Sequence, residues 1–185
     1  MLTSEPQWVA LYTNPRAEKK AESNLKETGF EVYLPLRKEL HTWSDRKKWV
    51  EVPLLKSYIF AKITAKQQIP VVNVSGVTAL VRFHNHIATI PESEIQMMKD
   101  FIAAEVDVQV LTMEKLKRGS RVRIHSGPLA GKIGTLVSDC EEGNFAVEIT
   151  GISMAMVVYV DKALMEEVPD DVQPTVHKKR KYMIR

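Results

Sequence analysis

The chain has 185 residues, 44% hydrophobic and 7% aromatic, and its 8 glycines and 9 prolines exclude collagen-like and wholly disordered proteins. No apolar run approaches the roughly 20 residues of a membrane-spanning helix, and the first residues lack the pattern of a signal peptide, so we expect a cytoplasmic protein without a membrane partner. The single cysteine, Cys140, excludes an internal disulfide and a cysteine-based zinc site.

The net charge of +3 is distributed unevenly along the chain. Residues 1–103 hold 14 Lys or Arg against 11 Asp or Glu, residues 104–176 hold 7 against 12, and residues 177–185 hold 5 against none. These zones of different sign indicate separate partner surfaces rather than one surface that coats nucleic acid. The basic end, residues 169–185, is expected to be disordered.

The first zone is predicted to be a mixed α/β unit. Residues 8–13 form an apolar run without polar alternation, which is typical of a strand buried on both faces. Asn14 and Pro15 are suited to open a helix over residues 15–28, which ends before Gly29. The apolar residues of this helix are spaced by four, at Ala17, Ala21 and Leu25.

Further along the first zone, strands alternate with turns before a second helix. A hairpin is predicted near residues 40–50, and the β-branched and aromatic residues of 57–63 and 77–83 favour strands. Pro91 opens a helix over residues 92–104. Its apolar face consists of Ile95, Met98 and Ile102.

The second zone is predicted to be a small β-barrel. Residues 104–116 show no clean period and read as a linker, and short β-like segments separated by turns follow in residues 117–168. The fold class is therefore α+β, with domains at 1–103 and 117–168.

Enzyme signatures are absent from the sequence: it has no phosphate-binding loop, dinucleotide fingerprint, nucleophile elbow or zinc-protease motif. His84 and His86 lack a third metal ligand and are better explained as exposed loop residues. Acidic neighbours of Cys140 disfavour a reactive thiolate. We expect no catalysis, cofactor or metal.

Two ordered sets of motifs carry a resemblance to a known family. The N-terminal zone, with WVALYTNPRAEKKAESNLKETGFEVYLP, PLLKSYIFAKI, GVTALVRF and IPESEI, resembles the NGN domain of NusG-family transcription elongation factors. The C-terminal zone, with KRGSRVRIHSGPLAGKIGTLVS and AMVVYVDKALMEEV, resembles a KOW domain. The resemblance implies an NGN-type α/β sandwich with an antiparallel sheet that binds RNA polymerase, a linker, and an SH3-like barrel that recruits a second factor.

The family's apolar patch for the clamp helices of RNA polymerase maps onto residues in predicted strands. An apolar groove with aromatic anchors is a familiar way to hold a helix. The alternative is that each of these side chains fills the domain core. The positions are Tyr12, Leu55, Tyr58, Phe60, Leu80 and Phe83.

Two regions are candidates for nucleic-acid binding. On the first helix, Arg16, Lys19, Lys20 and Asn24 lie away from the apolar face, and in RfaH-like members this neighbourhood contacts the non-template DNA strand, with Asn73 and Ser75 in a nearby loop. The alternative is a solvated helix face, because Glu18 and Glu22 are interleaved with the cations.

The predicted hairpin is the second candidate region. Basic residues interleaved with aromatic ones can neutralise phosphate and stack on unpaired bases. An ordinary hairpin with cross-strand aromatic pairs explains the same residues equally well. The basic residues are Arg37, Lys38, Arg46, Lys47 and Lys48, and the aromatic ones are His41, Trp43 and Trp49; of these, Trp43, Arg46, Lys47 and Lys48 are the predicted binding residues.

In the C-terminal zone, Gly127, Pro128 and Gly131 are expected to form the KOW loop. By resemblance, Ile152 lies near the surface that meets a ribosomal protein or Rho, although it could equally belong to the core. We expect a monomer.

The long hairpin and short linker favour a specialised, RfaH-like antiterminator of the capsular polysaccharide type over a housekeeping factor. Residues 66–71 depart from the Thr-rich stretch with which RfaH-like members contact the polymerase gate loop. The alternative function is a ribosome- or RNA-associated KOW protein acting in translation, against which the net charge of −5 over residues 104–176 argues.

Overall fold

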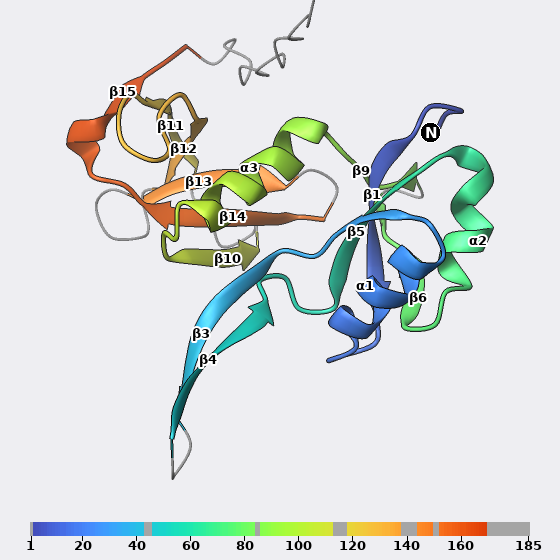
Figure 1. Ribbon diagram of the computed structural model, residues 1–185. Coiled ribbons are helices and arrows are strands. Elements are labelled where there is room, and N and C mark those ends of the chain that lie inside the picture. The colour runs from blue at the N-terminus through green and yellow to red at the C-terminus, as the bar shows by residue number, and fades with distance from the viewer. Residues whose placement is uncertain are drawn as a thin grey trace, which may run out of the picture.

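The computed structural model describes residues 2–42, 46–83, 86–112, 118–137, 144–149 and 152–169 (Figure 1). Its N-terminal part is an antiparallel sheet of five strands in the order β2-β5-β1-β6, with β9 also pairing with β1. The strands are β1 (Gln7–Thr13), β2 (Glu31–Tyr33), β5 (Tyr58–Ile63), β6 (Val77–Leu80) and β9 (Thr89–Ile90). We call this the N-terminal sheet.

Both faces of the N-terminal sheet are covered, as the apolar run of residues 8–13 predicts. Alternate side chains of a strand point to opposite faces, so one set packs beneath helices α1 and α2 and the other beneath α3. The helices are α1 (Glu18–Glu27), α2 (Gln68–Val72), which follows the short helix η1 (Ala65–Gln67), and α3 (Glu92–Ala103). The sequence did not predict η1 or α2.

Helix α1 begins later than its sequence predicts. Arg16 has a φ of 63°, in the left-handed region, so Pro15 and Arg16 form a turn and cannot continue into the helix. The N-cap residue is Ala17, with no side-chain cap, and the prediction of Asn14 in that role is wrong. The buried residues Ala21 and Leu25 confirm the predicted apolar face.

A two-stranded ribbon separates β2 from β5. Strands β3 (Leu36–Thr42) and β4 (Lys47–Pro53) pair along their whole length, which confirms the hairpin near residues 40–50 and extends it. Within the described residues these strands pair only with each other, and Figure 1 shows them extending away from both larger sheets. The short strands β7 (Arg82–Phe83) and β8 (His86–Ile87) make a second small pair.

The C-terminal part is a six-stranded antiparallel sheet in the order β10-β14-β13-β12-β11-β15. Five of its strands follow residue 117, which together with the N-terminal layers confirms the α+β class. The strands are β10 (Val108–Thr112), β11 (Arg118–Ile124), β12 (Ile133–Val137), β13 (Asn144–Ile149), β14 (Met154–Tyr159) and, after the short helix η3 (Lys162–Leu164), β15 (Met165–Glu167).

Strand β10 lies inside residues 104–116, the segment expected to be a linker. It pairs with β14 from Val108 opposite Val158 to Thr112 opposite Met154. The alternating valines at 106, 108 and 110 have the period of a strand. This pattern is the sequence signal for β10 that the prediction of a linker overlooked. The domain boundaries themselves stay a prediction.

The C-terminal sheet packs against α3. The rings of Phe101 on α3 and Phe145 on β13 are 6.4 Å apart in an edge-on arrangement, and Lys132 forms an ion pair with Asp100. One continuous cluster of buried residues therefore runs from the N-terminal sheet through α3 into the C-terminal sheet. In the described residues, no helix is long and apolar enough to cross a membrane.

Candidate functional site

Two tyrosines of the predicted patch meet on one face of the N-terminal sheet. Tyr12 of β1 and Tyr58 of β5 are directly opposed in the register, so their side chains share a face. Their ring centroids are 4.8 Å apart, and the Tyr58 hydroxyl donates a hydrogen bond to the Tyr12 hydroxyl at 3.1 Å. Tyr12 is 39% exposed and Tyr58 only 9%. The partly exposed ring of Tyr12 is therefore available at the surface and packs against the buried ring of Tyr58.

Two more residues of the predicted patch lie in the core of the same part of the molecule. Leu55 and Phe60 are 1% and 0% exposed and belong to the same buried cluster as Tyr58. Both are therefore core residues that contribute no exposed surface themselves. We call Tyr12, Tyr58, Leu55 and Phe60 the aromatic patch.

Of the remaining two residues, Leu80 lies away from this patch. Leu80 is opposite Leu11 in the register and packs with the core beneath α1 and α2, on the other face of the sheet. Phe83 lies in β7, and its side chain is outside the described part of the structure.

The hydroxyl of Tyr58 is held in its neutral form. Burial raises the pKa of Tyr58 well above its usual value, and the hydrogen bond and charge interaction with Tyr12 raise it further. At neutral pH the phenol therefore remains a hydrogen-bond donor, and the patch carries no charge of its own.

A buried carboxylate fixes the turn that precedes Tyr58. Glu18, at the start of α1, is 6% exposed, and its Oε1 accepts a hydrogen bond from the backbone N–H of Ser57 at 2.8 Å. Ser57 has a φ of 62°, and its carbonyl accepts a hydrogen bond from the Thr13 N–H at 2.9 Å. The interpretation of Glu18 as part of a solvated face is wrong. Nothing local in the sequence indicates this contact, because its partner is 39 residues away.

Three of the predicted nucleic-acid-binding residues surround one hollow. Asn24 on α1 and Asn73 and Ser75 after α2 line a cavity of about 430 Å³ together with Glu27, Thr28, Pro70 and Val74. The Asn24 amide donates a hydrogen bond to the Ser75 carbonyl at 2.8 Å, which ties the loop to α1. Gly76 allows this approach, since a Cβ there would lie 3.1 Å from the Cβ of Ala21. We call this space the α1 hollow.

The predicted cations of α1 lie outside the lining of this hollow. Lys20 is exposed one turn before Asn24, on the same side of the helix. Lys19 is 3.9 Å from Glu51 of β4, and Arg16 is exposed in the turn before the helix. The hollow is therefore lined by the amides of Asn24 and Asn73. The predicted cation that lies closest to it along the helix face is Lys20, one turn before Asn24.

The basic residues that were predicted in the hairpin lie together at the start of β4 and directly before it. Arg46, Lys47 and Lys48 are exposed in succession. Trp43 lies outside the described residues, whereas Trp49, the other tryptophan of the predicted hairpin, is described and highly exposed.

A comparison with known protein families identifies the family to which the N-terminal part of the chain is similar. The model of the family described as transcription termination factor NusG matches residues 6–99, about half of the chain. The chain belongs to the NusG family. It is therefore a transcription factor of the kind that binds RNA polymerase, and the expectation that it is not an enzyme is confirmed by this membership.

Solved structures of NusG and Spt5 are similar at a greater distance. A structure of Thermotoga maritima NusG, concerned with its domain interaction, matches at 20% identity and a TM-score of 0.49, covering 89% of this chain and 98% of that one. A crystal structure of the MjSpt4:Spt5 complex in conformation A matches at 15% identity and a TM-score of 0.25, covering 87% and 97%. No curated protein matches.

In the C-terminal sheet, the residues expected to form a KOW loop lie in a tight turn. Gly127 and Gly131 have φ values of 86° and 82°, in the region that favours glycine, and the Gly131 N–H donates to the Ile124 carbonyl at 2.7 Å. Pro128 is exposed in this turn. Ile152 is 7% exposed and packs in the buried cluster, so this arrangement does not present it to a partner.

Proposed function

We propose that this NusG-family chain binds the clamp helices of RNA polymerase through the aromatic patch and suppresses pausing or termination, with specificity for particular operons. The observation that carries the proposal is the exposure of Tyr12 on top of a buried aromatic cluster. A ring held rigidly by its neighbours loses little conformational entropy on binding, and such aromatic anchors supply most of the energy at interfaces.

Binding of this kind acts on transcription by shifting populations. A factor that prefers the elongating form of polymerase over the paused form favours elongation by its differential affinity, and about 1.4 kcal/mol of preference is a tenfold effect. The proposed effect on pausing therefore needs a modest preference and no chemical step.

Selectivity for an operon requires contacts to bases in addition to contacts to phosphate. We propose that the α1 hollow contacts the non-template DNA strand, with Lys20 neutralising phosphate and Asn24 or Asn73 contacting a base edge. The polar lining of the hollow supports this role. Glu27 at its rim disfavours phosphate there, so the backbone would pass on the Lys20 side.

The specialised role rests on the same features that distinguish the chain at the sequence level. The ribbon of β3 and β4, visible in the sequence as a long hairpin, supports an RfaH-like factor of the polysaccharide-operon type. The helices η1 and α2 stand where RfaH-like members have a Thr-rich contact segment, so we propose no gate-loop contact. A ribosomal protein or Rho would bind the C-terminal sheet. Ile152 would take part only if that sheet rearranges, because it is buried.

The test is binding to core RNA polymerase by the full chain and by Tyr12→Ala. Tyr12 is half exposed, so its loss should spare the fold and weaken polymerase binding by more than about 1 kcal/mol. Tyr159→Ala is the matched control, because Tyr159 is an exposed aromatic residue of the C-terminal sheet, at 64%.

Single-round transcription on the leader of the chain's own operon gives the functional readout. Wild-type protein should increase full-length product, and Lys20→Ala with Asn24→Ala should reduce that effect more than it reduces polymerase binding. No change in pausing or termination with wild-type protein on any leader would reject the antitermination role.

A further inference from the structure

The ribbon exposes an apolar pair that neither core uses. Leu40 and Trp49 are directly opposed in the register, so both side chains lie on one face of the ribbon. Leu40 is 44% exposed and Trp49 is 63% exposed. A two-stranded ribbon is marginally stable by itself, and an apolar pair left in water adds little packing to it. The exposed pair is therefore a candidate contact surface.

Positive charge lies on the tip side of this pair. Lys47 precedes Trp49 by two residues, which puts it on the same face, about 7 Å away along the strand. Lys48 lies on the opposite face. Both ammonium groups are exposed, and neither has an ion-pair partner among the residues that the structure describes.

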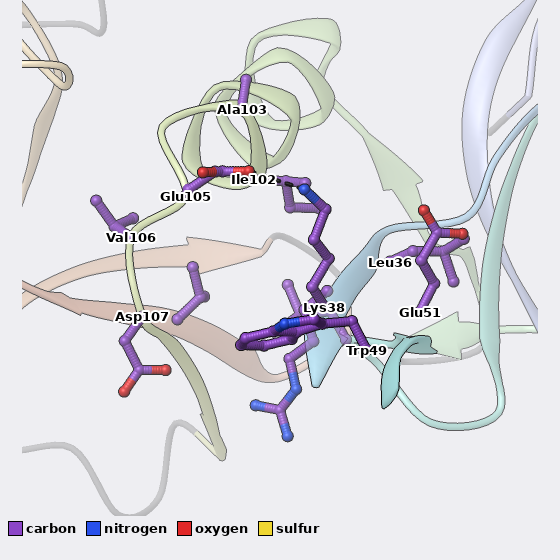
Figure 2. A pocket seen from close by; sticks show the side chains of 12 residues that line it. Leu36, Lys38, Trp49, Glu51, Ile102, Ala103, Glu105, Val106 and Asp107 are labelled. Carbon is purple, nitrogen blue, oxygen red and sulfur yellow. Dashed lines mark hydrogen bonds and ion pairs between the residues drawn. The ribbon is translucent and has the colours of Figure 1, made fainter. Parts of the chain in front are cut away.

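At the base of the ribbon, the charge of Lys38 is paired with a carboxylate. Lys38 donates a hydrogen bond to Glu105, just after α3, at 2.9 Å, and this contact lowers the pKa of Glu105 and raises that of Lys38 (Figure 2). The space of about 860 Å³ between the ribbon and the end of α3 is lined by Trp49 itself, by Arg37 and Lys38, and by Glu51, Glu105 and Asp107. The three carboxylates outnumber the two cations, so a nucleic acid would reach the exposed indole of Trp49 from the tip side of the ribbon and not through this groove.

The ribbon also adjoins the α1 surface. Lys19 of α1 lies 3.9 Å from Glu51 of β4, so the base of the ribbon is next to the predicted basic face of that helix. The ribbon tip and the α1 surface are nevertheless separate contacts, because a strand running directly between them would pass the carboxylates at the base of the ribbon.

We propose that the tip half of the ribbon binds single-stranded DNA, with one base stacked on Trp49 and the neighbouring phosphate at Lys47. This rests on the proposed action at the exposed DNA strand and adds a second, separate contact to it. Unpaired bases present the flat faces that an exposed indole can stack on, whereas duplex bases do not. Because every base has such a face, the contact adds affinity and carries little sequence preference.

The test is fluorescence anisotropy of a labelled 12-nucleotide single-stranded oligodeoxythymidine with the full chain. Trp49→Leu keeps an apolar partner for Leu40 but removes the ring, and it should weaken binding about tenfold or more, whereas Trp49→Phe should stay within a few-fold of wild type. Lys47→Gln should reduce the slope of log affinity against log salt by about 0.7, whereas Lys48→Gln, on the opposite face of the ribbon, is the matched control and should leave the slope nearly unchanged.

The outcomes separate this proposal from the proposed function. Tyr12→Ala should lose polymerase binding and keep DNA binding, and Trp49→Leu should do the reverse. Equal affinity of wild type and Trp49→Leu for the oligonucleotide would overturn the proposal, as would tighter binding to a duplex of the same length. Binding only to the matching RNA would overturn the assignment to DNA.

Discussion

The aromatic patch and the Leu40–Trp49 pair of the ribbon have the same local geometry. Only the aromatic patch is supported by a packed core. In each, two large side chains face each other across an antiparallel register, Tyr12 with Tyr58 and Leu40 with Trp49. Tyr58 is buried in the core beneath α3, whereas the ribbon has solvent on most sides. The difference teaches that an exposed aromatic residue can rest on a packed core at one place and stand on an unsupported ribbon at another.

The largest expected effect is on the free energy of unfolding, because only the aromatic patch belongs to a packed core. Phe60→Ala removes the fully buried ring of the aromatic patch and should cost about 3–5 kcal/mol in the free energy of unfolding, measured by urea denaturation. Polymerase binding would then be lost through unfolding, so this variant does not test the interface. A cost below about 1 kcal/mol would mean that the patch is not built on a packed core.

The hydroxyl bond of the patch should have a smaller effect. Tyr58→Phe keeps the ring and removes the hydrogen bond to Tyr12, which should cost about 0.5–1.5 kcal/mol at neutral pH.

The pH dependence of Tyr58→Phe sharpens the comparison. Because the pKa of Tyr58 is raised in the folded state, its contribution to stability is present below the unfolded pKa of about 10 and is lost as the pH rises above it. Unfolding measured from pH 8 to 11 should show a steeper alkaline loss for wild type than for Tyr58→Phe. Parallel curves would contradict a buried Tyr58 hydroxyl.

Trp49→Leu should change stability by less than about 0.5 kcal/mol, since the ribbon packs against little. Urea denaturation of this variant, with Phe60→Ala as the contrasting case, measures the difference between the two regions directly. A large loss would show that the ribbon supports the fold, and the tryptophan would then need no ligand to explain it.

The smallest effect is expected at the base of the ribbon. Lys38→Gln breaks the exposed ion pair with Glu105 and should leave the unfolding midpoint unchanged within error. Thermal unfolding in low and high salt provides the measurement. A salt-dependent destabilisation would mean that this contact links the ribbon to the C-terminal part more firmly than its exposure suggests.

Sequence patterns predicted the elements whose signals are local. The apolar run of residues 8–13 identified a strand covered on both faces, and Pro91 with the apolar spacing after it located α3. The ordered motifs also predicted the family, because they depend on residue identity along the chain and not on contacts.

Only the tertiary structure decided which of these residues meet, since contacts between distant segments leave no local pattern. It placed Leu80 on the face opposite Tyr12, buried Glu18 against Ser57, and joined Asn24, Asn73 and Ser75 around one hollow. It also recruited β10 into the C-terminal sheet. The composition of the chain fixes what must be buried, but sheet register and helix packing determine which side chains remain available to a partner.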